Sequence, residues 1–114
     1  MPRPQPNFVF FISDDHGYRD SPLYGNRQVC TPALESIARE GTIYANTFVG
    51  SPTCVPSRAT LMTGLMPARH GAEPNHSDLR EGIRTLPAYL SALGYAVAHF
   101  GKGHFRPQES YRDW

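Results

Sequence analysis

The sequence predicts an α/β fold in which helices flank a mostly parallel sheet. Three runs rich in β-branched and aromatic residues, 7–13, 42–49 and 95–100, have the length and composition of strands. Segments with helical character separate these runs, and such alternation favours a parallel sheet whose faces are covered by helices. The chain has 114 residues, enough for one small domain with its own core, so we expect residues 1–114 to lie in a single domain.

The composition is typical of a soluble globular protein. Hydrophobic residues make up 39% of the chain and charged residues 18%. The formal net charge is +1 and there is no basic cluster, so we expect neither nucleic acid nor a membrane surface as a partner. The apolar run 8–12 is too short for a signal-peptide core or a membrane span. As written, the sequence predicts a cytoplasmic protein, and a missing leader would make it periplasmic or secreted.

The first predicted strand, 7–13, ends in two adjacent carboxylates, Asp14 and Asp15. Neighbouring carboxylates repel each other and resist burial unless a cation or a basic group compensates their charge. Their oxygens are ligands suited to calcium or magnesium, but the same dipeptide is common in exposed turns. From these two residues alone, a metal site and a turn are equally good interpretations. His16 and Asp20 carry side chains that are chemically able to bind a cation as well.

A helix follows, beginning at Thr31 and Pro32. Thr31 has the side chain of an N-cap, Pro32 suits the first helical position, and Gly41 ends the helix. Its apolar stripe consists of Leu34, Ile37 and Ala38. Just before it lies Cys30, which we expect to be a small packed residue and not part of a disulfide framework.

The segment 54–64 places a second cysteine at the start of another helix. Pro56 suits a first helical turn and Gly64 is a natural end, so we expect Cys54 just before the helix N-terminus. Free amides and the helix dipole attract anions there. Arg58, one turn further on, adds a fixed positive charge that suits a tetrahedral oxyanion. A buried structural cysteine before an ordinary helix is the alternative.

The rest of the chain contains a loop, a helix and the third strand. The segment 65–82 is rich in turn formers, and its two histidines, His70 and His76, are expected to be solvated, with a catalytic role for either as the lesser alternative. Thr85 begins a helix that ends at Gly94, and the strand 95–100 follows.

The third strand ends at a short motif, Gly101-Lys102-Gly103-His104. Lys102 offers a point charge to an oxyanion, and His104 can donate a hydrogen bond or carry a proton near neutral pH. In open α/β sheets ligands bind beyond the carboxyl ends of the strands, which favours a role for this motif and for the carboxylates after the first strand. No secondary structure element is indicated for residues 105–114.

These motifs resemble the type I sulfatases, a family of the alkaline phosphatase-like superfamily. Residues 54–64, CVPSRATLMTG, match every fixed position of the family pattern C-x-P-S-R-x-x-L-x-T-G. Residues 94–104 match G-Y-x-[ST]-x-x-x-G-K-x-H except at Val97, where Ser or Thr is usual. Gly103 stands where a large aromatic residue is often found, which bears on the shape of the substrate pocket. The helix TPALESIAREG, residues 31–41, also resembles a family stretch.

The resemblance implies a sulfatase fold, of which residues 1–114 would form the N-terminal part. In this family a formylglycine-generating enzyme oxidises the motif cysteine to formylglycine, so Cys54 would become the nucleophile and a metal ligand. Asp14 and Asp15 would bind a divalent cation, usually calcium, with magnesium as the alternative. The reaction would be hydrolysis of a sulfate ester or a sulfamate, carried by a small molecule or a sugar.

The same resemblance gives roles to three further residues. Arg58 would orient and activate the hydrated formylglycine, Lys102 would bind the sulfate, and His104 would hold the second hydroxyl group. The family is several times longer than this chain, so the remaining metal ligands and the leaving-group residues would lie beyond residue 114. We therefore expect the piece alone to be inactive. The alternatives are a phosphonate monoester or phosphodiester hydrolase of the same superfamily, and an inactive truncated fragment.

Overall fold

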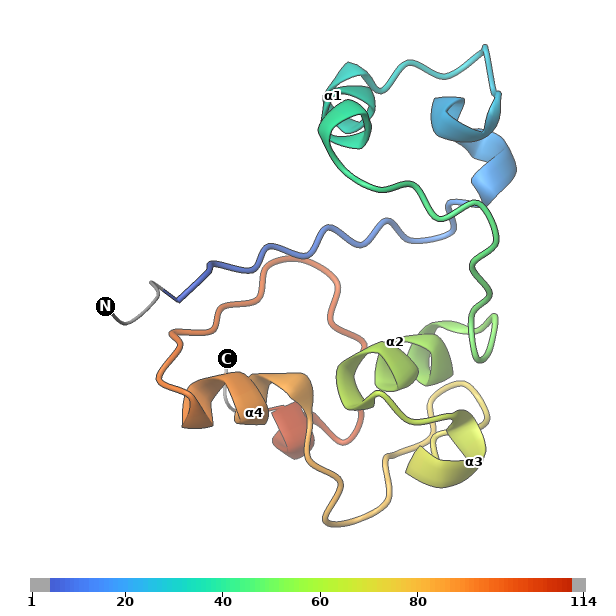
Figure 1. The fold of residues 1–114 in the computed structure, drawn as a ribbon. Coiled ribbons are helices and arrows are strands. Elements are labelled where there is room, and N and C mark those ends of the chain that lie inside the picture. The colour runs from blue at the N-terminus through green and yellow to red at the C-terminus, as the bar shows by residue number, and fades with distance from the viewer. Residues whose placement is uncertain (1–4, 112–114) are drawn as a thin grey trace. The chain divides into compact units, whose positions relative to one another are not determined.

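The computed structural model describes residues 5–111, and the regular elements in this range are all helices (Figure 1). The α-helices are α1 (Pro32–Glu40), α2 (Cys54–Thr63), α3 (Pro67–His70) and α4 (Leu86–Ala92). Three short 3-10 helices, η1 (Tyr18–Asp20), η2 (Pro22–Tyr24) and η3 (Gln108–Tyr111), complete the order of elements. The chain divides into two compact units, Met1–Thr47 and Phe48–Trp114.

The segments predicted as strands, 7–13, 42–49 and 95–100, do not form strands in the described range 5–111. A strand exists only through hydrogen bonds to a neighbouring strand, and no such ladder joins these segments within that range. Their large apolar side chains are correspondingly exposed, with Phe11 at 84% and Phe100 at 92%. The mostly parallel sheet therefore stays a prediction.

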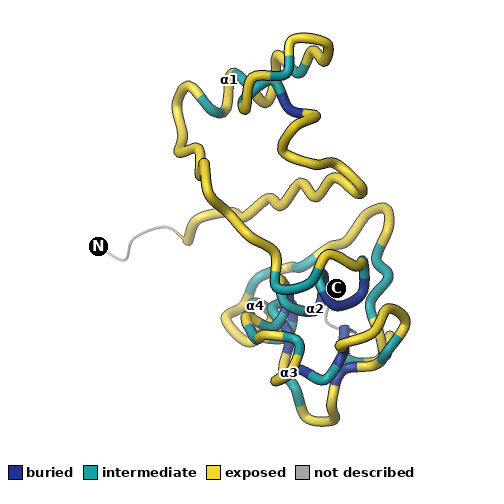
Figure 2. The backbone as a smooth tube through the Cα atoms, turned by 90° about the vertical axis from the view of Figure 1, so that its right-hand side faces the viewer, coloured by how far each residue is buried: buried dark blue, intermediate teal, exposed yellow. Residues whose placement is uncertain are grey.

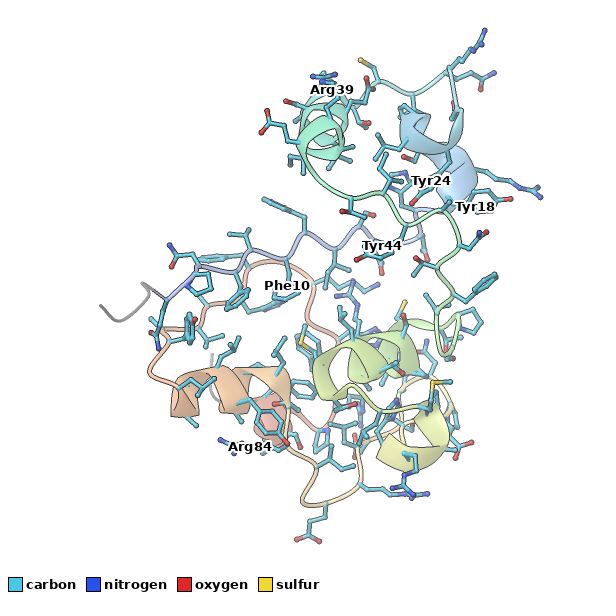
Figure 3. The ribbon with its side chains drawn as sticks, viewed as in Figure 1. Phe10, Tyr18, Tyr24, Arg39, Tyr44 and Arg84 are labelled. Carbon is cyan, nitrogen blue, oxygen red and sulfur yellow. The ribbon has the colours of Figure 1, made fainter. Side chains whose placement is uncertain are left out.

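Tyrosine side chains connect separate segments of the first unit. The Tyr24 hydroxyl donates to the carbonyl oxygen of Tyr44 at 3.0 Å, and the rings of Tyr18 and Tyr24 meet edge to face at 6.1 Å (Figure 3). The helix α1 has the bounds that the sequence predicts, although the Thr31 side chain at its N-cap makes no capping hydrogen bond. Cys30, predicted to be packed, is exposed, because this unit covers few of its own side chains.

The core of the second unit is built on one face of α2. Val55, Ala59 and Met62 are spaced four and three residues apart, so they fall on the same side of the helix, and all are buried. Figure 2 shows buried positions gathered along α2 and the segments next to it. The buried apolar residues that complete this core are Ala72, Leu79 and Tyr111, with the partly buried Ile83, Leu86 and Phe105 packed against them.

The helix α2 begins earlier than the sequence predicts, at Cys54 itself. Thr53 has an extended backbone and takes the N-cap position. Pro56 then becomes the third helical residue, where its missing N–H would have had no partner inside the helix. The predicted end is confirmed, since Gly64 has a left-handed backbone and its amide donates to the Thr60 carbonyl at 2.9 Å.

The segment after the GKGH motif, for which the sequence indicates no element, closes the same core. Its 3-10 helix η3 ends at Tyr111, whose buried ring stacks on Phe105 at a centroid distance of 4.5 Å. The Thr85 hydroxyl at the start of α4 donates to the Ser110 carbonyl at 2.9 Å, which fastens this segment to α4. None of the helices described in residues 5–111 has the length and apolar character that crossing a bilayer would require.

His70, predicted to be solvated, is completely buried behind α2. Its Nδ1 accepts from the Ala72 amide at 3.1 Å, so in the neutral ring the proton lies on Nε2, which meets Thr60 Oγ1 at 3.1 Å. Burial lowers the pKa of His70, and this effect is partly offset by the Pro56 carbonyl and by Glu73. The ring is therefore a neutral structural group.

We expect His70 to make the protein less stable in acid. Its pKa in the folded state lies below the unfolded value of about 6.5, so below that pH the unfolded chain binds the proton more readily. The free energy of unfolding should fall as the pH drops from 7 towards 5, by at most about 1.4 kcal/mol per pH unit from this group. Urea unfolding of the full-length protein and of His70→Gln at several pH values measures this slope.

The His70→Gln variant should show a smaller loss of stability in acid than the wild type. At neutral pH it should be less stable by about 1–3 kcal/mol, because the Ala72 amide loses its acceptor. His99→Gln is the matched control, since His99 is an exposed histidine of the same unit. An equal acid slope in wild type and His70→Gln would contradict the prediction.

Candidate functional site

Cys54 occupies the first position of α2, half-buried at the positive end of the helix dipole. The preceding Thr53 carbonyl accepts the first helical hydrogen bond, from the Ser57 amide at 3.0 Å. The Val55 amide donates to Asn75 Oδ1 at 3.2 Å, so a side chain from another loop caps the helix. Residue 54 thus lies where the helix N-terminus favours a negatively charged group.

Lys102 and Arg58 are joined to this helix end. The Lys102 ammonium donates to Cys54 Sγ at 3.6 Å, and Arg58 Nη1 donates to the Lys102 carbonyl at 2.9 Å. Arg58 is only 7% exposed, so its guanidinium is held within the unit. The structure therefore brings Cys54, Arg58 and Lys102 together, although 44 or more residues separate Lys102 from the other two.

The charges around residue 54 suit a tetrahedral anion. Lys102 contributes an ammonium group at the sulfur, and Arg58 fixes the backbone that carries this lysine. A guanidinium and an ammonium group beside a helix N-terminus can together bind the oxygens of a sulfate or phosphate group. The geometry of this cluster is thus compatible with a reaction at either a sulfate or a phosphate group.

His104, the fourth predicted catalytic residue, lies two residues beyond Lys102 and makes a contact that the sequence does not predict. Its Nε2 lies 3.1 Å from His76 Nδ1, and the two ring centroids are 5.0 Å apart. The sequence favours a solvated loop histidine for His76, with a catalytic role as the lesser alternative, and does not single out Asn75. Their contacts join residues 28 and 20 positions apart, so no local pattern in the sequence could have revealed them.

Asp14 and Asp15 belong to the first unit, where they lie in a bend and are exposed. Asp15 has a left-handed backbone with φ of 52°. The nearby Asp20, which is also able to bind a cation, instead accepts the Gly17 amide at 3.1 Å and so supports the start of η1. The two adjacent carboxylates thus offer oxygen ligands only, the kind that calcium and magnesium prefer.

Gly103 stands where the resembled pattern often has an aromatic residue, and its surroundings are crowded by two rings. A Cβ atom built on Gly103 would lie 3.1 Å from the Phe105 ring and 3.3 Å from the His99 ring. These two rings meet edge to face at 5.4 Å and occupy the space beside the glycine. In this chain, the side chains of neighbouring positions thus occupy the space next to residue 103.

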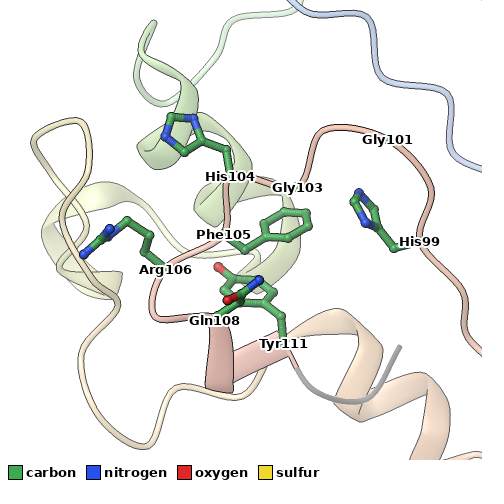
Figure 4. Close-up of a pocket in the computed structure, with 8 residues that line it drawn as sticks. All are labelled: His99, Gly101, Gly103, His104, Phe105, Arg106, Gln108 and Tyr111. Carbon is green, nitrogen blue, oxygen red and sulfur yellow. The ribbon is translucent and has the colours of Figure 1, made fainter.

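A pocket of about 390 Å³ lies beside His104 (Figure 4). Arg106 at its edge forms an ion pair with Asp78 at 2.9 Å. The buried Tyr111 hydroxyl has no hydrogen-bond partner among the described residues 5–111, and burial raises the pKa of Tyr111 to about 12. The residues that line the pocket are His99, Gly101, Gly103, His104, Phe105, Arg106, Gln108 and Tyr111.

Comparisons with known proteins point to one family. The family described as Sulfatase matches residues 6–112, nearly the whole chain. An ulvan-active sulfatase from Formosa agariphila is 36% identical over 113 residues, which cover 96% of this chain and 23% of that protein. A Delta 4,5-hexuronate-2-O-sulfatase from Bacteroides thetaiotaomicron is 37% identical over 105 residues, which cover 88% of this chain and 22% of that protein.

A human protein is similar over the same region. The N-sulphoglucosamine sulphohydrolase of Homo sapiens is 34% identical over 110 residues, which cover 92% of this chain and 22% of that protein. The chain thus spans about a fifth of the length of these curated relatives. No solved structure matches it.

Proposed function

Because this chain belongs to the sulfatase family, for which an alkaline phosphatase-like fold is implied, we propose that the protein hydrolyses a sulfate ester or a sulfamate and releases sulfate. The observation that best supports this proposal is the contact between the Lys102 ammonium and Cys54 at the N-terminus of α2. We further propose a sulfated sugar or small molecule as substrate, because relatives named above are described as acting on such compounds.

The nucleophile in this proposal is formylglycine, made from Cys54 by a formylglycine-generating enzyme. The modification would supply a hydrated aldehyde, one hydroxyl of which attacks sulfur while the bond from sulfur to the ester oxygen or sulfamate nitrogen breaks and the alcohol or amine leaves. Arg58 orients the modified side chain, and Lys102 binds the sulfate and stabilises the negative charge that develops on its oxygens. His104 holds the second hydroxyl and accepts its proton when the aldehyde is restored.

We propose that Asp14, Asp15 and the modified residue 54 bind calcium, with magnesium as the alternative. The ligand chemistry supports this set only after modification. A cysteine sulfur is a soft ligand unsuited to calcium, whereas the hydrated aldehyde offers oxygen, as the two carboxylates do. When bound, the cation would supply positive charge that polarises the sulfate oxygens.

We also propose that residues 1–114 are the N-terminal part of one catalytic domain, in which 7–13, 42–49 and 95–100 pair as strands of a mostly parallel sheet. The exposed aromatic side chains of these segments, such as Phe11 and Phe100, support this proposal. They would be covered if helices packed on both faces of a sheet.

Turnover of an aryl sulfate by the full-length protein, made together with a formylglycine-generating enzyme, tests the proposed function. An aryl phosphonate and an aryl phosphodiester are assayed in parallel, because the same charges can bind a phosphoryl group. We expect preference for the sulfate, loss of turnover with a chelator and recovery with calcium. Preference for the phosphonate would favour the related hydrolases, and no turnover of any ester would favour an inactive protein.

A further inference from the structure

We propose that His76 is a positioning residue that holds the imidazole of His104 in its working orientation. This inference rests on the proposed function, because it assigns His104 to the reacting group and gives His76 a supporting role. It is independent of the family motifs, none of which contains residue 76. Three observations on the second unit carry it.

The first observation is the hydrogen bond between the two rings. His76 Nδ1 and His104 Nε2 lie 3.1 Å apart, and the rings are inclined by 53°. In such a bond one nitrogen must carry a proton and the other must present a lone pair, so at least one of the rings is neutral. The contact therefore restrains the orientation of the His104 ring and couples the proton on its Nε2 to the tautomer of His76.

The second observation is the backbone of both residues. His76 has φ of 67° and His104 has φ of 52°, a left-handed conformation that is uncommon outside glycine and that histidine and aspartate adopt more often than most other residues. Among the described residues other than glycine, only Asp15 shares it, and Asp15 is a proposed metal ligand. Such strain persists only where the surrounding structure enforces it, and it gathers at functional sites. His76 thus shares this property with two residues of the proposed site.

The third observation is that the loop carrying His76 is fastened to the nucleophile helix. The adjacent Asn75 accepts from the Val55 amide at 3.2 Å, in the first turn of α2. The Ser77 hydroxyl on the other side closes the loop by donating to the Pro74 carbonyl at 2.6 Å. Two consecutive side chains therefore contact the helix that carries Cys54 and the motif that carries His104.

These contacts specify what loss of His76 should do. The ring of His104 would remain in the site but could adopt other orientations, so the chemical step would slow while substrate binding would change little. Removal of a group that orients a functional residue typically lowers activity by roughly 10- to 100-fold. A purely structural role would instead lower stability and affect all variants at this position alike.

The test uses the full-length protein in which Cys54 has been converted to formylglycine, with an aryl sulfate as substrate. The variants are His76→Ala and His76→Asn, and Glu73→Ala is the control. Glu73 is an exposed residue of the same loop. Asparagine places a polar atom close to where His76 Nδ1 lies and tolerates the left-handed backbone, so it keeps the contact without the ring. We measure kcat, KM and the thermal unfolding midpoint of each protein.

We expect His76→Ala to lower kcat by roughly 10- to 100-fold with KM changed less than about threefold. His76→Asn should recover a large part of kcat, and Glu73→Ala should match the wild type. A normal kcat in His76→Ala would overturn the inference, as would a change confined to KM or a failure of asparagine to do better than alanine. An inactive mature wild type would instead contradict the proposed function itself, and the inference with it.

Discussion

Replacement of Cys54 by alanine in the full-length protein is expected to abolish turnover. Residue 54 is the proposed nucleophile, and alanine can be neither oxidised to formylglycine nor hydrated to a diol. Loss of a catalytic nucleophile commonly lowers kcat by roughly 10⁴- to 10⁶-fold, leaving only what binding and charge stabilisation contribute. Steady-state turnover of an aryl sulfate, measured in protein made with the maturation enzyme, gives this ratio.

Cys30→Ala is the matched control for this experiment, because Cys30 is an exposed free cysteine outside the site. Its activity should equal that of the wild type. The mass of the tryptic peptide 40–58, which contains Cys54 and no other cysteine, should show loss of sulfur and gain of an aldehyde oxygen in both active proteins. An unmodified thiol in active protein would contradict the formylglycine mechanism and leave the thiol itself as the nucleophile.

Replacement of Lys102 by methionine should produce the second-largest loss. Methionine retains an unbranched chain of similar length but removes the ammonium group that lies 3.6 Å from the sulfur of residue 54. Removal of one group that stabilises charge in the transition state typically costs about 10²- to 10³-fold in kcat. Because the Lys102 contact with Arg58 uses the backbone carbonyl, the substitution should leave that hydrogen bond in place.

Two further variants, Lys102→Arg and Arg84→Met, test whether the loss comes from the ammonium group of Lys102. Lys102→Arg keeps the positive charge but presents a planar fork, so it should recover only part of the activity. Arg84 is an exposed cation whose guanidinium lies 4.5 Å from the centroid of the Tyr89 ring, and Arg84→Met should therefore be fully active. If Lys102→Met were as active as Arg84→Met, the ammonium group would have no part in the reaction.

The ends of the helices could be predicted because local residues determine them. Pro32 and Gly41 delimit α1, and Gly64 ends α2 in the left-handed backbone that glycine tolerates best. The start of α2 was predicted too late, because Pro56 is compatible with any of the first helical positions. Local residues do not determine strands in this way, since the hydrogen bonds of a strand come from other strands and not from neighbouring residues.

Part of the candidate site could also be predicted from local residues. Cys54, Arg58 and Lys102 were singled out because their motifs are contiguous, and in the structure hydrogen bonds join them. His70 and His76 were assigned to one solvated loop, yet the first is buried against Thr60 and the second contacts His104. Distant partners decide the environment of each histidine, so its position in a loop says little about its role.

The crowding around Gly103 has a consequence for how related sequences can differ. The Phe105 ring lies 3.1 Å from where a Cβ atom of residue 103 would be, so an aromatic residue at 103 would require the ring at 105 to move. The two sites should therefore covary. Relatives with a bulky residue at 103 should carry a smaller or differently directed side chain at 105, and those with glycine at 103 should retain the aromatic ring two residues later.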